Sequence, residues 1–220
     1  MELNLDKTKL MIFNFTKDKQ FTINLKTECK YIDVVNETKL LGTVISSDLK
    51  WDKNIHSIIV RANARMEILR KLAEYNPKKE DMWIIYISYI RSVLEQSCQV
   101  WHSGLTDENK NDLERIQKNA FKIILKENYK DYESAMRELN LQKLETRREM
   151  LSKKFALKCL TNPKTSKMFP VKKNNKNLRY SEKYVITHAR TERLKNTAIP
   201  YMQRQLNSKF WEYTYNDNNS

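Results

Sequence analysis

Adjacent carboxylates are the side chains of this chain best suited to metal chemistry. They occur as Glu80-Asp81 and Asp107-Glu108. A two-metal site needs carboxylates that hold two cations about 3.5 to 4 Å apart. Both pairs fall instead in the expected first turn of a helix, where negative charge complements the helix dipole. We therefore expect these carboxylates to stabilise helices, and the sequence predicts no catalytic residue and no metal site.

Histidine and cysteine provide no second candidate for catalysis. The three histidines are isolated, and two glycines far apart cannot form a glycine-rich phosphate loop. Cys98 and His102 lie four residues apart, but two ligands without a second pair do not make a zinc site, so we expect Cys98 to be a small buried residue. Three widely spaced cysteines argue against a disulfide framework and favour an intracellular setting, either nucleus or cytoplasm.

Positive charge is the strongest compositional signal. Residues 1–50 hold eight lysines and seven acidic residues, a net +1, so residues 51–220 carry the other +13 of the total +14. Such an excess favours a polyanionic partner, either nucleic acid or an acidic membrane surface, although many lysines of this kind are simply solvated helix faces. The most apolar stretch, Trp83–Leu94, contains Arg91 and is shorter than the roughly 20 residues that span a bilayer. We therefore expect no membrane partner.

Two kinds of element must position these charges. Residues 9 to 46 are rich in β-branched and aromatic residues, and polar segments divide them. The predicted strands are Lys9–Phe15, Phe21–Leu25, Cys29–Val35 and Lys39–Ser46. Their short connections favour an antiparallel meander.

From Asp52 onward the apolar period changes to 3.6, which is typical of amphipathic helices. The apolar stripe of the first helix comprises Ile55, Ile58, Ala62, Met66 and Leu69, and Pro77 ends that helix. The further predicted elements are a helix over Lys79–Cys98, a helix capped by Thr106, helices over Tyr132–Leu139 and Leu141–Leu160, a strand over Tyr184–Ala189 and a helix over Thr197–Leu206. In the Leu141–Leu160 helix we expect Phe155 to face the core, and Lys143, Arg147, Lys154 and Lys158 to lie outside. The expected fold class is α+β, a small antiparallel β-meander followed by a mainly α-helical bundle.

Two segments near the N-terminus carry a family resemblance. They are Leu3–Phe13 (LNLDKTKLMIF) and Leu40–Trp51 (LLGTVISSDLKW). They resemble the last two palm segments of the reverse transcriptases of non-LTR, jockey-like retrotransposons. In that family the first segment follows the catalytic Asp-Asp hairpin, and the second forms the primer grip. Weaker matches follow in the family's order at Trp101, Leu113–Ala120, Leu141–Arg148, Thr191–Arg193, Ile199–Pro200 and Leu206–Asn207.

The resemblance implies the back end of an RNA-directed DNA polymerase. Its parts would be a palm-edge and primer-grip-like β segment (1–51), a helical thumb-like domain (52–161), a basic loop (162–177), and a C-terminal strand/helix segment with a tail (178–220). No Asp-Asp dipeptide occurs in the 220 residues. We therefore expect a fragment without polymerase activity of its own and without a cofactor, Mg²⁺ being implied only for a full-length enzyme.

The resemblance also implies a nucleic-acid site made of six residues. They are the palm lysine Lys7, the grip residues Leu41 and Gly42, and Lys53, Arg61 and Arg65 on the first thumb helix. Contacts to phosphates would give this site affinity for RNA or an RNA/DNA hybrid with little sequence preference. Two alternatives stay open. Gly42 could form an ordinary bend, and the chain could be a scaffold or protein-interaction module whose apolar surface binds a missing palm and fingers region or a second copy.

Overall fold

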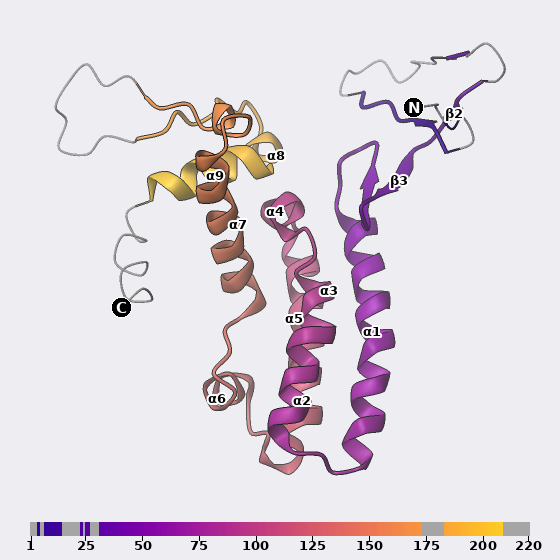
Figure 1. The fold of residues 1–220 in the computed structure, drawn as a ribbon, viewed down its shortest axis with the longest axis vertical. Helices are drawn as coiled ribbons and strands as arrows, with labels where there is room; N and C mark the ends of the chain where they lie inside the picture. Colours follow the sequence, from indigo (N-terminus) through magenta and orange to yellow (C-terminus); the bar gives the residue numbers. More distant parts are fainter. Residues whose placement is uncertain are drawn as a thin grey trace.

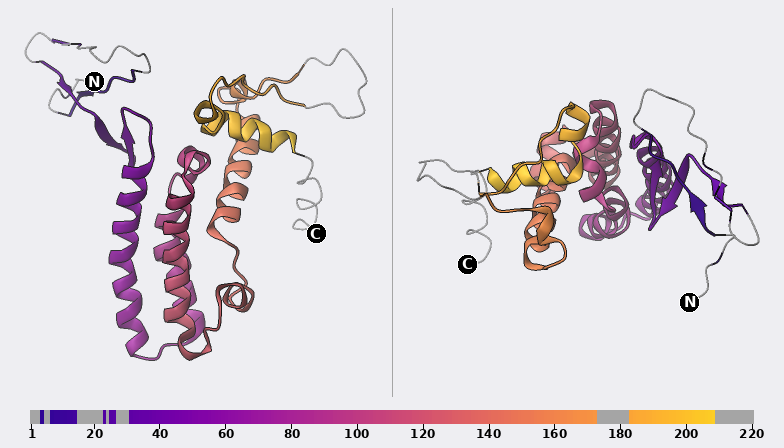
Figure 2. Two further views of the ribbon diagram at one scale, coloured as in Figure 1. Left: turned by 180° about the vertical axis from the view of Figure 1, so that it is seen from behind. Right: turned by 90° about the horizontal axis from the view of Figure 1, so that it is seen from above.

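The computed structural model describes Asn4, Ile23 and residues 7–14, 25–26, 31–172 and 183–208. It has the α+β fold that the sequence predicts, with the strands at the N-terminal end and helices in the rest of the described chain (Figure 1). The three long helices are α1 (Asp52–Glu74), α5 (Asp107–Leu125) and α7 (Leu144–Thr161). Helix α5 packs against both α1 and α7, as the views in Figure 2 also show.

The β structure consists of two separate pairs of strands. Strand β1 (Lys9–Leu10) pairs in parallel with β2 (Asp33–Val34), and β3 (Glu37–Leu40) pairs antiparallel with β4 (Thr43–Ser46). The prediction of antiparallel pairing is thus confirmed for β3 and β4. The prediction of one four-stranded antiparallel meander is wrong, because β1 and β2 pair in parallel in a separate sheet. Most of the predicted strand Phe21–Leu25 lies outside the described residues.

A hairpin turn divides the segment Lys39–Ser46, which was expected to be one strand. Leu40 pairs with Thr43, which leaves Leu41 and Gly42 as a two-residue turn. Both have positive φ angles, 48° and 86°. Two-residue hairpins of this type require positive φ at both central positions and usually carry Asn-Gly or Asp-Gly. Leucine at the first position hides that signal in the sequence.

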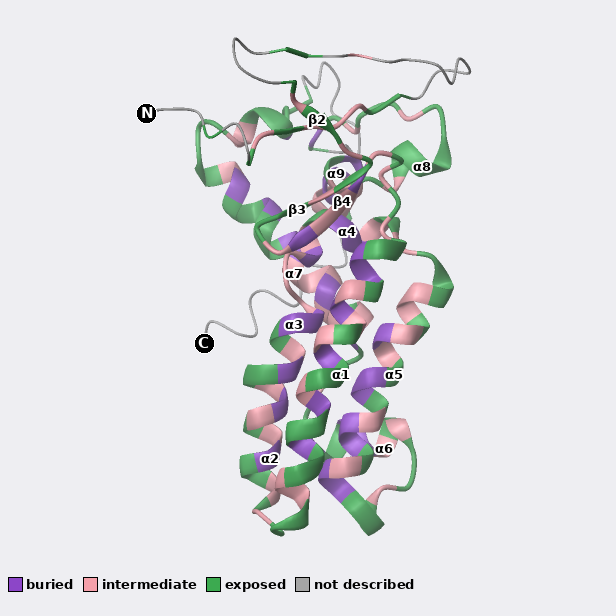
Figure 3. Ribbon diagram, turned by 90° about the vertical axis from the view of Figure 1, so that its right-hand side faces the viewer, coloured by how far each residue is buried: buried purple, intermediate pink, exposed green. Residues whose placement is uncertain are grey.

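Helix α1 buries the predicted apolar stripe, as the purple face in Figure 3 shows. Ile55, Ile58, Ala62, Met66 and Leu69 are all at most 1% exposed. The helix ends at Glu74, and Asn76 has a left-handed φ of 47° immediately before Pro77. The predicted helix and its end are therefore confirmed.

The helix predicted over Lys79–Cys98 is present without interruption from Lys79 to Leu94, but it contains a π-helical turn and ends before Cys98. Its pieces are α2 (Lys79–Ile85), the π-helical turn η1 (Tyr86–Arg91) and α3 (Ser92–Leu94), followed by α4 (Cys98–Trp101). In η1 the buried Tyr86 hydroxyl donates to Gln117 Oε1 at 2.6 Å. Ser97, with a left-handed φ of 54°, separates α3 from α4. The predicted helix is therefore confirmed up to Leu94 and wrong beyond it.

The later elements follow the sequence more closely. Thr106 caps α5 by accepting a hydrogen bond from the Asn109 backbone at 3.2 Å. The remaining helices are η2 (His102–Gly104), η3 (Lys126–Asn128), α6 (Tyr132–Glu138), η4 (Ser166–Met168), α8 (Glu192–Lys195) and α9 (Ala198–Asn207). The strand predicted from Tyr184 is reduced to a single antiparallel bridge between Val171 and Tyr184.

The end of α7 forms a second, smaller core with α9. Its buried members are Ala156, Cys159, Phe169, Tyr184 and Met202. Because Ala156 and Cys159 take the inward positions on α7, Phe155 is turned outward and is 45% exposed. The expectation that Phe155 faces the core is therefore wrong, whereas Lys154 and Lys158 are exposed as predicted.

Candidate nucleic-acid interface

The hairpin turn between β3 and β4 rests on the side chain of Gln96. The Gln96 Nε2 atom donates to the Leu41 carbonyl at 3.4 Å. Gly42 has a φ of 86°, and a Cβ atom at this position would overlap the Gln96 amide. Glycine is thus favoured here by the backbone conformation, and any larger residue would also displace the Gln96 amide. The sequence offers two roles for Gly42, a grip residue or an ordinary bend. In this structure Gly42 does form a bend, the second residue of the hairpin turn.

Gln96 also links the turn to Arg61 on α1. Its Oε1 atom accepts from Arg61 Nη1 at 2.7 Å, while Arg61 Nε donates to the Ser57 carbonyl at 3.3 Å. Partial burial and the nearby charge of Arg65 lower the pKa of Arg61. The guanidinium is still a cation at neutral pH because its reference pKa is above 12. The positive charge of Arg61 is therefore held close to the hairpin turn by the shared contact with Gln96.

Asn54 anchors the base of the hairpin. Its side chain is 1% exposed, and its Oδ1 atom accepts from the Val44 backbone at 3.0 Å. After β4, the Ser46 hydroxyl donates to Asp48 Oδ1 at 2.6 Å. Hydrogen bonds from Ser46 and from the Lys50 backbone lower the pKa of Asp48. The hairpin is therefore fixed to α1 at its base as well as at its turn.

Lys53 and Arg65 lie on α1 but are already engaged. Lys53 forms an ion pair with Glu37 on β3, in which the two side chains are 61% and 53% exposed. The guanidinium of Arg65 lies 4.3 Å from the centroid of the Tyr89 ring and donates to the Tyr89 carbonyl. A phosphate that binds either cation must share it with these partners. The cost is small for Lys53, since exposed ion pairs contribute little to stability.

Lys7 lies apart from the other predicted site residues. It is exposed, and its backbone NH bonds to the Asn4 side chain at 3.2 Å. Among the described residues, no hydrogen bond or ion pair joins Lys7 to the hairpin turn or to α1. The structure thus brings Leu41, Gly42 and Arg61 together through Gln96, a residue that the sequence did not indicate. Gln96 follows α3 and lies 55 residues from Leu41, so no local pattern marks it.

No protein-family model matches this chain. No curated protein and no solved structure matches it either. In the part of the chain that the structure describes, no helix is long and apolar enough to cross a membrane.

The residues considered for catalysis are buried or lie at the starts of helices. Cys98 is fully buried as predicted, and burial raises the pKa of its thiol to about 12. Burial and the positive charge of Arg148 lower the pKa of His102 to about 3, so its ring is neutral at physiological pH. Both carboxylate pairs lie in the first turns of α2 and α5, also as predicted. Within the described ranges, no group of three or more His, Cys, Asp or Glu side chains could hold a metal ion.

The hairpin and α1 form one surface. It has a fixed turn with an exposed tip, since Leu41 is 89% exposed, beside cations on α1 whose present partners are weak or shared. Cations that helices hold in place can contact phosphates without first being ordered.

Proposed function

We propose that the helical part of this chain binds RNA or an RNA/DNA hybrid through phosphates, as its resemblance to a retrotransposon thumb implies. The observation that carries the proposal is the net +13 of residues 51–220, the described part of which is mainly a helical bundle. Neutralising phosphates releases counterions, and this release supplies most of the affinity of sequence-independent binding. The turn held by Gln96 and Arg61 supports a grip-like contact beside that charge.

Salt dependence of binding tests the proposal directly. The affinity for a labelled RNA/DNA hybrid should fall linearly with salt on logarithmic axes, with a slope of about −0.7 to −0.9 per phosphate contact. Lys53→Gln with Arg65→Gln should weaken binding and reduce that slope. The matched control is Lys71→Gln with Lys78→Gln, which removes two exposed lysines near the other end of α1. A slope near zero for the unmodified chain would contradict the proposal.

The proposal gives these 220 residues no nucleotidyl-transfer activity, because no Asp-Asp dipeptide is present to hold the two metal ions. The purified chain should give no primer extension with Mg²⁺ or Mn²⁺. Template-dependent incorporation that disappears when an Asp or Glu of this chain is mutated would contradict this part of the proposal.

A protein-interaction role is the second candidate, and exposed apolar residues near the hairpin favour it. Leu41 is 89%, Leu40 58% and Phe13 45% exposed. Short strands with uncovered edges also invite pairing with another chain. Analytical ultracentrifugation distinguishes the two candidates. Concentration-dependent association that Leu40→Lys abolishes, without any salt-dependent binding of nucleic acid, would favour the interaction role.

A further inference from the structure

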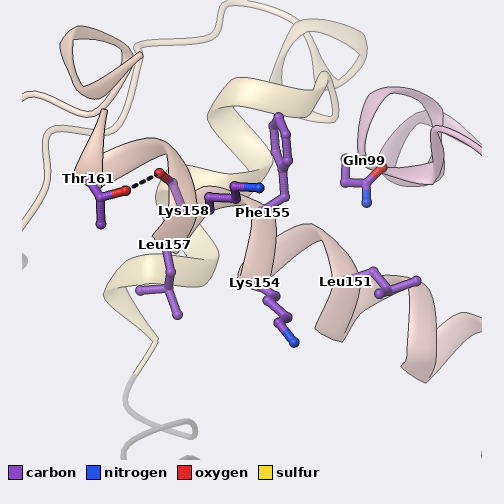
Figure 4. A pocket seen from close by; sticks show the side chains of 7 residues that line it. All are labelled: Gln99, Leu151, Lys154, Phe155, Leu157, Lys158 and Thr161. Carbon is purple, nitrogen blue, oxygen red and sulfur yellow. Dashed lines mark hydrogen bonds between the residues drawn. The ribbon is translucent and has the colours of Figure 1, made fainter. Parts of the chain in front are cut away.

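An open groove runs along α7 and extends to α4. Its lining comprises Gln99 of α4 together with Leu151, Lys154, Phe155, Leu157, Lys158 and Thr161 of α7 (Figure 4). Its volume of about 530 Å³ falls within the range of roughly 300 to 1,000 Å³ typical of ligand-binding clefts. No acidic residue lines it.

Phe155 is the unusual member of this lining. Figure 4 shows its ring standing out from α7, with Lys158 beside it and Lys154 extending to the opposite side in this view. The ring is 45% exposed, although a phenyl group has no polar atom to satisfy in water. One exposed apolar side chain alone needs no explanation. An exposed aromatic ring close to cations is, however, the combination that binds unpaired bases.

The charge around the groove is of one sign. Residues 150–172 contain six lysines and no acidic residue. Of these six, Lys154, Lys158, Lys164 and Lys167 are exposed and make no ion pair with any described residue. They contrast with Lys53, whose ammonium is paired with Glu37. The lysines at this end of α7 can thus contact phosphates without giving up a partner.

We propose that the α7 groove binds single-stranded nucleic acid, with a base stacked on Phe155 and the flanking phosphates on Lys154 and Lys158. This inference rests on the proposed nucleic-acid binding and adds a second site with a defined class of ligand. The two lysines are one helical turn apart, about 6 Å along the axis, so they can contact phosphates on both sides of one stacked base.

Stacking makes the groove selective for unpaired strands. In a duplex both faces of each base are covered by neighbouring bases, so only an unpaired base can offer a face to Phe155. Every base has such a face, and the site should therefore be indifferent to sequence. Binding at the hairpin and α1 involves phosphates alone and lacks this distinction between strands.

Phe155 substitutions in the full chain test the site. The probes are a labelled 20-nucleotide poly(U) RNA and a blunt 20-base-pair RNA/DNA hybrid, measured by fluorescence anisotropy. Phe155→Ala should weaken poly(U) binding about tenfold, the loss of one stacked base, and change hybrid binding less than twofold. Phe155→Trp should retain poly(U) binding, while Phe155→Leu should weaken it about as much as Phe155→Ala does. Tyr75→Ala is the control, because Tyr75 is an 83% exposed aromatic residue outside the groove.

Lysine substitutions test the charge. Lys154→Gln with Lys158→Gln should make the salt slope for poly(U) shallower by about 1.4, the share of two single-strand contacts. All these residues are exposed, and circular dichroism would verify that the variants fold. Unchanged poly(U) binding by Phe155→Ala, or an equal loss for poly(U) and hybrid, would overturn the α7 site alone. If the unmodified chain binds neither probe, the proposed function fails as well. If Phe155→Ala weakens binding to phosphatidylserine vesicles but leaves poly(U) binding unchanged, the groove is a membrane contact and the inference is overturned.

Discussion

Arg61 and Gln96, 35 residues apart in the sequence, are joined by a hydrogen bond of 2.7 Å between Nη1 and Oε1. The same Gln96 side chain bonds to the Leu41 carbonyl, so one amide connects helix α1 with the hairpin turn. Substitutions at these three positions should have non-additive effects on the free energy of unfolding, because residues in one hydrogen-bond network do not act independently.

The two residues of the hairpin turn should respond to substitution with opposite signs. Gly42→Ala should destabilise the chain by about 1 to 3 kcal/mol, because alanine is strained at this φ and its Cβ overlaps Gln96. Leu41→Asn should stabilise it by about 0.5 to 1 kcal/mol, because asparagine tolerates a left-handed φ better than leucine does. Leu41 is 89% exposed, so little packing is lost. Urea unfolding measures both. Equal effects of the two substitutions would contradict the assigned turn.

A double-mutant cycle measures the link between Arg61 and Gln96. We expect Arg61→Ala and Gln96→Ala to show a coupling free energy of about 1 kcal/mol, since either change alone removes the same bond. The cycle Arg70→Ala with Gln96→Ala is the control, because Arg70 pairs with Glu67 on the exposed side of α1. Additive effects at Arg61 and Gln96 would show that the bond contributes nothing measurable.

The elements that the sequence predicts well are those with local signals. Helix α1 follows from an apolar residue every three or four positions, and the start of α5 follows from Thr106 with two acidic residues after it. Such signals depend only on neighbouring residues. They can therefore be recognised in the sequence without knowledge of the tertiary structure.

The features that could not be predicted depend on distant contacts. The π-helical turn around Tyr86 accompanies a hydrogen bond to Gln117, 31 residues away, and the groove on α7 exists because the second core takes Ala156 and Cys159. Phe155 was expected inside, since an aromatic residue at this spacing is usually buried. Gln96, the centre of the candidate site, is a polar residue in an irregular segment and has no sequence signal at all.

Arg148 provides a test of the main core. Its side chain is fully buried, its guanidinium lies 5.9 Å from the Trp101 ring centroid, and its Nε atom donates to His102 at 3.4 Å. Neither Nη atom has a hydrogen-bond partner among the described residues. Arg148→Ala should cost about 3 kcal/mol through the cavity that it leaves. Arg148→Met should cost at least about 1 kcal/mol less, because it fills the space and removes a buried charge. Equal losses in urea unfolding would mean that the charge itself stabilises the core.

His102 should make stability fall as the pH falls. Its pKa is about 3 in the folded chain, lowered by burial and by the charges of Arg148 and Lys110. The unfolded chain, with a histidine pKa of about 6.5, binds the proton first, so the His102 contribution is complete above pH 6.5 and is lost progressively toward pH 3. Between pH 7 and pH 5 this loss is about 2 kcal/mol. His102→Gln should lose correspondingly less stability over the same interval. Parallel losses in the two proteins would contradict the low pKa.

The rate of amide hydrogen exchange in each strand should depend on how firmly the strand is bonded to the helices. Strands β1 and β2 have two residues each and should exchange fastest, while α5 in the core should exchange slowest. The β3–β4 hairpin should lie between them, because Asn54 and Gln96 hold it to α1. Gln96→Ala should accelerate exchange in the hairpin and leave α5 unchanged.

The same measurement of amide hydrogen exchange distinguishes the two candidate functions. An RNA/DNA hybrid should slow exchange in the hairpin and α1 at any protein concentration if the site binds phosphates. Slower exchange that appears in β1 and β2 only at high protein concentration, with no effect of the hybrid, would instead indicate pairing between chains and contradict nucleic-acid binding at the turn.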